Sequence, residues 1–561
     1  MIRPLVPLAL LGLSACTTVS QRSLAPGALD APVEVQILGL NDFHGNLETP
    51  LAPVALVQPD GSKVEGRFGG AAALAGTLQN LRAGRPSVTV AAGDLIGATP
   101  LASAYFLDEP SIAALSAAGL EIAAVGNHEF DKGSAELIRM QRGGCEQHVS
   151  RLPCRLEPFR GAGFSYLAAN VLTQSGNSLF PGTAVKQLGP MRVGFIGMTL
   201  TETATLVTPA GVAGLRFADE AGTANALVPA LRSAGADAIV LLIHQGGRVS
   251  EVYQETGCAG LSGEILPILD KLDPAITIVV SGHTHNAYAC EVERGGARRL
   301  LTSAGKNGYL VTDIRLQFDP VSRKVVARKA VNVSVTGSGD PSVAALVARY
   351  VAAAEPAARR VVGRLPGPAL RDAEDGESAA AALVADSQLA ATRDPQRGGA
   401  QIAFINSSGV RTDLKPRPDG SVTFGDLFAM QPFGNNLVVK TLTGAQLKSL
   451  LEQQFKVAEN KARIGSLLVP SDGFRFAYDL ARLEGQRIVA MTLNGRPIDA
   501  AARYRVTVNN FLASGGDGFS VLAQSGEAFD AGLDLDALEA WLVRNPKLPI
   551  LGRVREVVAA R

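Results

Sequence analysis

The first 315 residues alternate short apolar runs with stretches of helical composition. Between the first two runs, Gly69–Arg82 has the composition and spacing of a helix. Alternation of this kind predicts an α/β domain. The strand-like runs are Val33–Leu40, Val88–Ala92, Glu121–Val125, Arg192–Ile196, Ala238–Ile243 and Ala275–Val280.

The pattern changes near residue 340, where we expect a helix that connects two domains. Asp340 can cap free N–H groups, and Pro341 suits the first helical position. Apolar residues follow at helical spacing, and Pro356 is expected to end or kink the helix. Further strand-like runs follow at Gln401–Ile405, Leu437–Thr441 and Tyr504–Val508. We expect a first domain over 33–338, a connecting helix over 339–360 and a second α/β domain over 361–557.

Length and charge limit the classes of function. The 561 residues are too many for one hydrophobic core, so two or more domains are expected. Hydrophobic residues make up 47% and charged residues 19%, as in ordinary globular proteins. Lys+Arg 53 against Asp+Glu 52 leaves a formal charge of +1. This balance argues against binding of a nucleic-acid polymer through a basic face, and we expect a monomer that acts on a small molecule.

The N-terminus has the features of a targeting segment. Arg3 precedes an apolar run, Leu5–Leu13, that is much shorter than the roughly 20 residues of a membrane-spanning helix. Leu13-Ser14-Ala15-Cys16 resembles a bacterial lipobox, in which the cysteine is lipidated. We therefore expect a signal peptide over 1–15, a lipidated tether over 16–32 and an outer-membrane anchor facing the periplasm. The alternative is an ordinary signal peptide that happens to contain a cysteine.

Four cysteines remain after Cys16, and an even number in an exported chain indicates two disulfides. The short Gly- and Pro-containing loop between Cys145 and Cys154 favours pairing these two with each other. Cys258 would then pair with Cys290. A zinc site is the rival interpretation, although the chain has no CxxC spacing.

The histidines are concentrated at the C-terminal ends of apolar runs. The chain has six, and all except His148 lie at or near such an end. Carboxyl ends of neighbouring strands in an α/β sheet open onto one crevice, so these residues can converge. The segments are Asn41-Asp42-Phe43-His44, Gly93-Asp94, Gly126-Asn127-His128-Glu129, His244 and Gly282-His283-Thr284-His285.

The residue types in these segments suit a metal site. Histidine nitrogens, aspartate oxygens and an asparagine carbonyl bind hard or borderline metals. Asp42 and His44 are two residues apart, as are His283 and His285, so each pair can point to one side of an extended segment. Taken singly, each segment is a common loop sequence. Five segments in order, each after a strand-like run, predict a metal centre.

Together these segments resemble those of the calcineurin-like metallophosphoesterases, and the second domain resembles the C-terminal domain of the bacterial 5′-nucleotidase and UDP-sugar hydrolase family. The resemblance covers about residues 33 to 555. It implies a metallophosphoesterase sandwich of two sheets flanked by helices, with two divalent ions (Zn, Mn, Co or Mg). It implies one metal held by Asp42, His44, Asp94 and His285. Asp94 bridges to a second metal, whose further ligands are Asn127, His244 and His283.

The same resemblance implies hydrolysis of phosphate esters by a metal-activated hydroxide. His128 would stabilise the transition state or protonate the leaving oxygen, with Asp131 orienting its ring. A neutral packing role for His128 is the alternative. The family often has an amide residue at the position of His285, and histidine there can change the preferred metal. We assign no role to His148.

The second domain carries motifs that resemble the nucleotidase substrate site. Gln431–Asn435 and Phe511–Asp517 imply that Phe433 and Phe511 sandwich a nucleobase, a contact that tolerates different bases. Asn435 and Asp517 would contact base and ribose. The turn from Asn406 to Arg411 resembles a glycine-rich segment whose arginine grips phosphate. Core packing is the alternative for the two phenylalanines, but their glycine-rich surroundings favour exposed loops.

One region departs from the family pattern. Glu374 stands where an arginine is expected, and Ala381-Ala382 replaces a Gly-Asn pair. Arg371 is the candidate replacement for the missing arginine, and the alternative is that one phosphate contact is missing. A 5′-nucleotidase acting on extracytoplasmic nucleotides is the favoured function. The departure leaves 2′,3′-cyclic nucleotides and UDP-sugars open as substrates.

Two other functions stay open. One is a catalytically silent surface lipoprotein that binds nucleotides, although the full set of ligand positions argues against it. The other is a relative acting on thiosulfonate esters, which would need a special cysteine near the metals.

Overall fold

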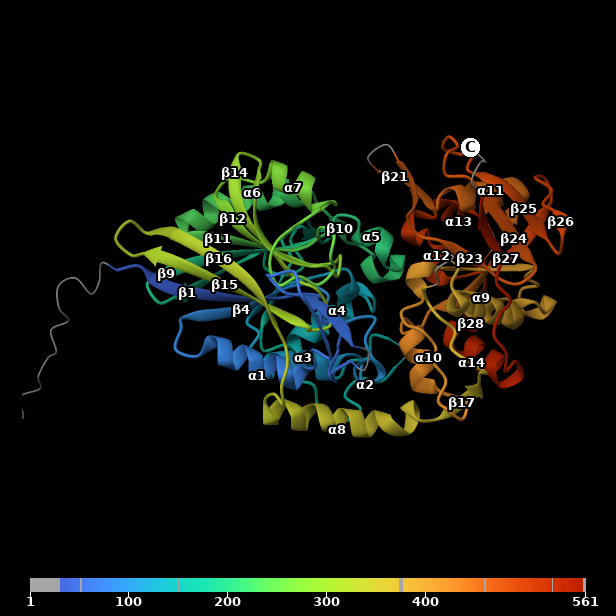
Figure 1. The fold of residues 1–561 in the computed structure, drawn as a ribbon, viewed down its shortest axis with the longest axis horizontal. Helices are drawn as coiled ribbons and strands as arrows, with labels where there is room; N and C mark the ends of the chain where they lie inside the picture. The colour runs from blue at the N-terminus through green and yellow to red at the C-terminus, as the bar shows by residue number, and fades with distance from the viewer. Residues whose placement is uncertain are drawn as a thin grey trace, which may run out of the picture.

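The computed structural model describes residues 31–50, 53–149, 151–372, 377–458, 461–526 and 528–557. The chain forms two domains, and helix α8 (Pro341–Ala358) runs along one side of both (Figure 1). The predicted lipidation site Cys16 and the atypical Glu374 lie outside the described residues.

Two six-stranded sheets form the first domain. One has the order β16-β15-β1-β4-β5-β6 and the other the order β13-β14-β12-β11-β9-β8. The strands of the first sheet are β1 (Val33–Leu40), β4 (Ser87–Ala92), β5 (Ile122–Ala124), β6 (Ser165–Leu167), β15 (Leu310–Asp319) and β16 (Lys324–Ser334). Those of the second are β8 (Thr183–Leu188), β9 (Met191–Thr199), β11 (Ala238–His244), β12 (Ile276–Ser281), β13 (Ala287–Arg294) and β14 (Ala297–Ala304).

The two sheets pack face to face, and helices cover their outer faces. Apolar residues from both sheets share one buried cluster, which includes Ile37, Val90, Val240 and Ile278. Helices α1 (Ala71–Arg82), α3 (Glu109–Ala117) and α4 (Ser134–Arg142) bury apolar residues against the first sheet. Helices α6 (Glu220–Ser233) and α7 (Ile265–Lys271) do so against the second. Strands buried on both faces lack polar alternation, which explains their continuous apolar sequence.

The predicted strands are confirmed, but they do not form one sheet. Strands β1, β4 and β5 run parallel in the first sheet, and β9, β11 and β12 run parallel in the second. The histidines therefore do not all follow strands of one sheet, in keeping with the two-sheet sandwich that the family resemblance implies. Their convergence instead comes from two facing sheets whose parallel strands end on the same side.

The connecting helix α8 begins as expected. The Asp340 carboxylate accepts hydrogen bonds from the backbone N–H groups of Ser342 (2.8 Å) and Val343 (3.0 Å), and Pro341 is the first helical residue. Pro356 lies within the last turn, and the helix ends at Ala358. Helix α8 contacts α1 and α3 of the first domain and α10 (Phe424–Met430) of the second.

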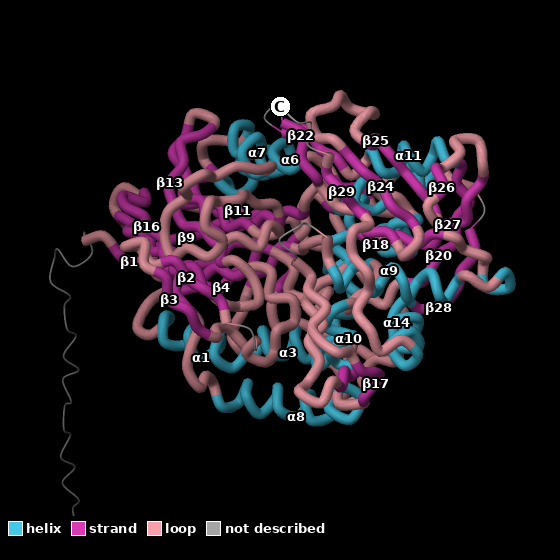
Figure 2. The backbone as a smooth tube through the Cα atoms, turned by 45° about the vertical axis from the view of Figure 1, so that its right-hand side comes forward, coloured by secondary structure: helices cyan, strands magenta, loops and turns pink. Residues whose placement is uncertain are grey.

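The second domain is built on a five-stranded and a four-stranded sheet (Figure 2). The five-stranded sheet has the order β23-β18-β27-β20-β28, and the four-stranded sheet the order β26-β25-β24-β29. Their strands are β18 (Ile402–Asn406), β20 (Asn436–Thr443), β23 (Leu468–Pro470), β24 (Phe474–Tyr478), β25 (Ile488–Leu493), β26 (Arg496–Pro497), β27 (Arg503–Asn509), β28 (Ala528–Leu533) and β29 (Val554–Glu556). Helices α9 (Ala379–Thr392), α11 (Gly444–Glu452) and α14 (Asp534–Arg544) complete the domain.

The structure shows where the alanine pair that departs from the family pattern lies. Ala381 and Ala382 lie in the first turn of α9 and are fully buried in the core of the second domain. Side chains of this size let the helix pack closely against its neighbours.

Two contacts between the domains involve short helices of the first domain. Leu101 and Ala104 of α2 (Leu101–Ala104) belong to the same buried cluster as Leu427 and Phe428 of α10. Helix α5 (Thr203–Leu206) of the first domain contacts the short helix η5 (Gly516–Gly518) of the second. The second contact lies beside the cavity described below.

The predicted disulfide pairing is confirmed. Cys145 is bonded to Cys154, and Cys258 is bonded to Cys290. Neither the zinc alternative nor a free thiol at the metal ligands fits these four cysteines. Across the described ranges, no helix combines the length and apolarity needed to cross a bilayer.

Candidate metal centre and substrate pocket

All seven predicted metal ligands meet at the carboxyl ends of the parallel strands. We call Asp42, His44, Asp94, Asn127, His244, His283 and His285 the metal-ligand cluster. They lie at or just after the C-terminal ends of five strands: β1, β4, β5, β11 and β12.

One group of donors surrounds Asp42. His44 Nε2 lies 3.8 Å from Asp42 Oδ1 and 3.0 Å from His285 Nε2, and His285 Nε2 lies 3.5 Å from Asp42 Oδ1. The ligand atoms of these three residues all lie within 4.8 Å of one another. This spacing suits donors that share one ion.

A second group surrounds Asn127. Its Oδ1 lies 3.1 Å from His244 Nε2 and 3.1 Å from His283 Nδ1. Asp94 Oδ2 lies 3.0 Å from His244 Nε2 and 3.9 Å from His44 Nε2. Asp94 is therefore placed between the two groups, where a bridging carboxylate would stand.

Hydrogen bonds to the far side of two rings fix which nitrogen faces the centre. His44 Nδ1 lies 2.9 Å from the carbonyl oxygen of Gly97, and His244 Nδ1 lies 2.8 Å from that of Ala92. Because a carbonyl only accepts, each Nδ1 carries a proton, and Nε2 is the ring nitrogen that faces the cluster. The donor set therefore fits a pair of divalent ions.

Burial keeps two ring ligands neutral. It lowers the pKa of His44 to about 3, and burial together with the nearby His244 lowers the pKa of His283 to about 3. Neutral imidazole is the form that binds a metal, so these rings need lose no proton at neutral pH.

The two carboxylates respond differently to burial. Burial raises the pKa of Asp42 to about 7, and the neighbouring Asp94 adds to the effect. Burial also opposes ionisation of Asp94, but the charges of His244 and His128 outweigh it and hold the pKa well below its usual value. Two buried carboxyl groups this close require positive charge to be ionised together.

The cluster also carries strained backbone. Five of its members adopt positive φ angles, which L-residues rarely do. Strain of this kind persists where the surrounding structure enforces it, and it concentrates at functional sites. The angles are 49° at Asp42, 46° at His44, 51° at Asp94, 71° at His283 and 60° at His285.

Glu129 holds the loops that carry Asp94 and Asn127, a role that the sequence did not reveal. Its buried carboxylate accepts hydrogen bonds from the backbone N–H groups of Asp94 (2.9 Å), Leu95 (2.8 Å) and Gly126 (2.7 Å). The signal was its place at the end of the Gly126–Glu129 motif. Gly126 also has no room for a side chain, because a Cβ would lie 2.5 Å from the Asp94 nitrogen.

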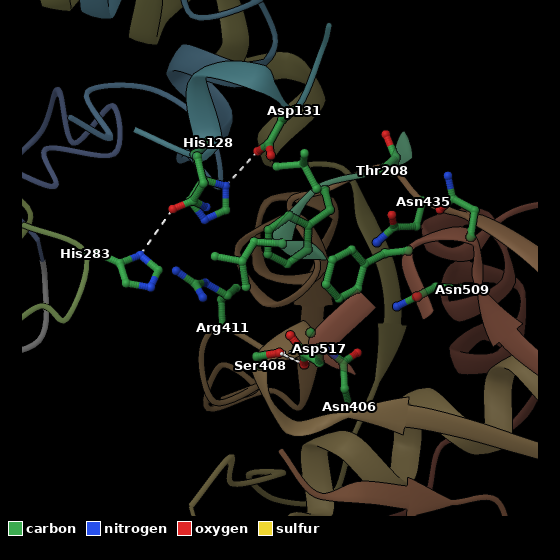
Figure 3. Close-up of a pocket in the computed structure, with 18 residues that line it drawn as sticks. His128, Asp131, Thr208, His283, Asn406, Ser408, Arg411, Asn435, Asn509 and Asp517 are labelled. Atoms are coloured by element: carbon green, nitrogen blue, oxygen red, sulfur yellow. Dashed lines mark hydrogen bonds and ion pairs between the residues drawn. The ribbon is translucent and has the colours of Figure 1, made fainter. Parts of the chain in front are cut away.

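His128 stands beside the cluster and is paired with Asp131. His128 Nδ1 lies 2.8 Å from Asp131 Oδ2 (Figure 3). Burial would lower the pKa of His128, yet the charges of Asp131 and Asp94 raise it above its usual value. Asp131 fixes the ring, so Nε2 is the nitrogen available to a ligand.

A cavity of about 300 Å³ lies between the domains, next to His128 and His283 (Figure 3). All the predicted substrate residues belong to the second domain, and all of them except Arg371 line this cavity. The Phe433 ring lies 6.1 Å from the His128 ring and is nearly parallel to it, at 13°. The Arg411 guanidinium lies 5.7 Å from the Phe433 centroid. The predicted residues that line the cavity are Asn406, Arg411, Phe433, Asn435, Phe511 and Asp517.

Asp517 is held by three donors. Its Oδ2 accepts hydrogen bonds from Asn406 Nδ2 (2.8 Å), Ser408 Oγ (2.8 Å) and Ser466 Oγ (2.7 Å). Asp517 has a φ of 56° and lines the cavity. Ser466 belongs to no recognised motif, and nothing in the sequence pointed to it.

The first domain also supplies part of the cavity wall. Leu206 is the last residue of α5, Val207 and Thr208 follow it, and all three line the cavity. No motif marked this segment.

Arg371 and His148 lie outside the cavity lining. The backbone N–H of Arg371 donates to Asp413 Oδ1 at 2.8 Å, and Arg371 Nε is buried with no hydrogen-bond partner within the described residues. His148 lies 3.8 Å from the exposed Glu146, apart from the metal-ligand cluster.

Comparison with known proteins matches the two domains separately. Residues 35–287 match the family model for calcineurin-like phosphoesterase, and residues 357–524 match that for the 5′-nucleotidase C-terminal domain. "Endonuclease YhcR" of Bacillus subtilis is 29% identical over 86% of this chain. "Cell wall protein Lmo0130" of Listeria monocytogenes is 30% identical over 88%. The chain spans only 37% and 65% of these two relatives.

A solved structure covers nearly the whole chain. The structure of a 5′-nucleotidase precursor from Thermus thermophilus aligns with a TM-score of 0.73 and 26% identity, over 93% of this chain and 99% of that one. Both domains therefore occur together in a known protein of similar extent. The chain belongs to the family of calcineurin-like phosphoesterases that carry a 5′-nucleotidase C-terminal domain.

Proposed function

We propose that this protein is a metal-dependent hydrolase that releases phosphate from nucleotides. The observation that carries the proposal is the shared position of two features. The metal-ligand cluster forms two groups around Asp94, and it opens directly onto a cavity that has aromatic walls.

Each of the two groups of donors in the metal-ligand cluster would hold one ion. Asp42, His44 and His285 would hold one ion, and His244, His283 and Asn127 the other, with Asp94 between them. Two divalent ions, when bound, supply an activated water at neutral pH and neutralise charge on phosphoryl oxygens.

His128 would act on the leaving group as a hydrogen-bond donor or general acid. Asp131 holds Nδ1, so Nε2 can donate a hydrogen bond or a proton to the leaving oxygen. Arg411 would contact the phosphoryl oxygens, since it lines the cavity on the side of His283.

The nucleoside would occupy the second-domain side of the cavity. Phe433 and Phe511 would stack on the base, and Asn435 and Asp517 would bind its polar edge and the ribose. The solved structure from Thermus thermophilus, named a 5′-nucleotidase precursor, supports this choice of substrate.

The test is phosphate release by the full mature chain. The protein would be stripped with a chelator and reloaded with Mn²⁺, Zn²⁺, Co²⁺ or Mg²⁺. We expect metal-dependent release of phosphate from 5′-AMP. The rate would be compared with the rates for 2′,3′-cyclic AMP, UDP-glucose and an aryl phosphate. Nucleotide binding without turnover in every metal form would contradict the proposal and favour a silent binding protein.

His128→Asn separates chemistry from metal binding. We expect kcat to fall by about 10²- to 10⁴-fold, since general acid catalysis is lost, with two ions per chain retained. His148→Asn is the matched control, because His148 lies on a surface loop. Unchanged kcat in His128→Asn would restrict His128 to packing.

We also propose an extracytoplasmic location with lipidation at Cys16. The two disulfides suit an oxidising compartment, and one relative is named a cell wall protein. Fractionation of cells fed labelled palmitate would test the anchor. Cys16→Ala should lose both label and membrane association. A labelled, membrane-bound Cys16→Ala variant would overturn it.

A further inference from the structure

Asp108 is a buried carboxylate that joins three segments beside the metal-ligand cluster. It is 0% exposed, and its Oδ1 accepts hydrogen bonds from the hydroxyls of Thr99 (2.6 Å) and Ser103 (2.8 Å). Its Oδ2 forms an ion pair with Lys132 Nζ at 2.6 Å. Asp108 directly precedes α3, yet its side chain makes no capping hydrogen bond to that helix. Helix capping therefore does not explain this carboxylate.

The first of these segments holds a metal ligand. Gly97 lies two residues before Thr99, and its carbonyl oxygen is 2.9 Å from His44 Nδ1. A Cβ at Gly97 would lie 2.5 Å from His128 Cβ and 2.8 Å from Asp131 Oδ2. The loop that Asp108 holds through Thr99 therefore packs between His44 and the His128–Asp131 pair.

The third segment follows the His128–Asp131 pair directly. The short helix η1 (His128–Phe130) leads into Asp131, and Lys132 is the next residue (Figure 3). Burial would lower the pKa of Lys132, yet the charge of Asp108 raises it above its usual value. Within the described ranges, Asp108 is the one acid in ion-pair contact with Lys132. This ion pair therefore connects the turn after η1 to the loop that holds His44.

The turn after η1 needs such a connection. Residues 131–134 are only half-buried, so packing restrains them less than it restrains the strand ends. The rings of His44 and His128 lie 5.2 Å apart at an angle of 77°. In the proposed function, His44 holds an ion and His128 acts on the leaving oxygen, so their relative position sets the alignment of the reaction.

We propose that Asp108 and Lys132 are positioning residues, whose ion pair holds the His128–Asp131 pair at a fixed place relative to His44. Neither residue lines the cavity, so both would act through His128. This inference rests on the proposed function, in which His128 assists departure of the leaving group.

The leaving group distinguishes positioning from general support. The nucleoside of 5′-AMP departs as a basic alkoxide, which needs a proton or a hydrogen bond from His128. The leaving group of 4-nitrophenyl phosphate is a stable phenolate, which departs without a proton. Displacement of His128 should therefore slow hydrolysis of the first ester and spare the second.

The double variant Asp108→Asn/Lys132→Met removes the ion pair with the least damage to the fold. Removal of both charges leaves no unpaired buried charge, and asparagine keeps an oxygen for Thr99 and Ser103. We expect kcat for 5′-AMP to fall by about 10- to 100-fold, because a small misplacement can cost that much. KM, both metal ions and kcat for 4-nitrophenyl phosphate should change by less than about twofold.

A matched control removes a similar ion pair elsewhere. Glu121 and Lys186 pair at 2.9 Å, and Glu121 precedes β5 at the end opposite the metal ligands. Glu121→Gln/Lys186→Met should leave the kcat values for both esters unchanged. Lys132→Arg should keep most of the activity, because a guanidinium can also pair with the Asp108 carboxylate.

The His128→Asn background supplies a readout that a merely structural role would not move. If the ion pair acts through His128, the double variant should cause no further loss of kcat for 5′-AMP in this background. Elemental analysis and thermal unfolding of every variant would establish that it is metal-loaded and folded. Lys132→Met alone gives the same comparison of esters if the double variant does not fold.

Unchanged kcat for 5′-AMP in the folded variant would overturn the inference. So would an equal loss for both esters, the loss of a metal ion, or a further loss in the His128→Asn background. Failure of the proposed function is a separate result, because it would appear as metal-loaded wild type that releases no phosphate from 5′-AMP.

Discussion

In the first domain the proposed metal ligands lie at or just after the ends of buried strands, whereas in the second domain the predicted pocket residues other than Asn406 of β18 lie on loops and short helices. Asp42 is 0% exposed and Asp94 1%. Phe433 lies in a turn after α10, and Phe511 lies on α12 (Asn510–Ala513), both half-buried. The part proposed to perform chemistry is thus anchored in the core, whereas the residues proposed to select a substrate lie mostly outside it.

The difference follows from what each part must do. A metal pair needs donors fixed to within a fraction of an ångström, and the strained backbone of the cluster is held by its neighbours. A nucleobase needs flat surfaces that tolerate different ligands. Loops can vary while the strands that carry the metal ligands stay unchanged.

Asp94→Asn should produce the largest effect and would test whether the first domain depends on one shared carboxylate. We expect kcat/KM to fall by about 10³-fold or more, because loss of a metal removes several kcal/mol of transition-state stabilisation. Elemental analysis should find fewer than two ions per chain. Asp60→Asn, at an exposed turn, is the control. Two retained ions with normal activity would contradict a bridging role.

Glu129→Gln should produce the second-largest effect, because Glu129 holds the loop that carries Asp94. An amide at this position places N–H groups against backbone donors, which leaves buried groups unpaired. We expect unfolding free energy to fall by about 2–3 kcal/mol and metal affinity by about 10- to 100-fold. Glu146→Gln, on an exposed loop, should change neither quantity. Chemical denaturation and metal titration measure the two effects.

The sequence revealed the metal-ligand cluster of the first domain more fully than the pocket residues of the second domain. Strand ends are readable because buried apolar runs stop where polar ligands begin, as at Val125 before Asn127. The seven ligand positions could therefore be selected before their geometry was known. What could not be read was that β1 and β11 belong to different sheets, since both are uniformly apolar.

Residues that act through tertiary contacts left little trace in the sequence. Ser466 reaches Asp517 across 51 positions, for example. The cavity wall at Thr208 has no motif at all. Family resemblance supplied Phe433 and Phe511, whose glycine-rich surroundings alone indicated only loops.

Phe511→Leu tests the pocket residues of the second domain. Loss of one base–aromatic contact, worth about 1–3 kcal/mol, should raise KM for 5′-AMP by about tenfold. A phosphate ester without a base should be hydrolysed as before, and the metal content should stay at the wild-type level. Phe529→Leu is the control, since Phe529 lies on β28 outside the cavity lining. An equal loss for both esters would mean that Phe511 supports the metal-binding domain instead.

Ser466→Ala should give the smallest effect. It tests how strongly substrate affinity depends on the position of Asp517. Asp517 keeps two of its three hydrogen bonds, so Oδ1 should still reach the ribose, with less restraint. We expect KM for the ribonucleotide to rise by about fivefold, since one hydrogen bond contributes about 1 kcal/mol. The kcat should not change.

A 2′,3′-dideoxynucleotide makes this last test specific, because it lacks the hydroxyls that Asp517 would bind. Its KM should be the same for Ser466→Ala and wild type, and Ser466→Thr should recover the ribonucleotide KM. Ser449→Ala, on the exposed side of α11, controls for loss of a hydroxyl. If both nucleotides lose affinity equally, Ser466 supports the loop as a whole, and the pocket is more rigid than its turns suggest.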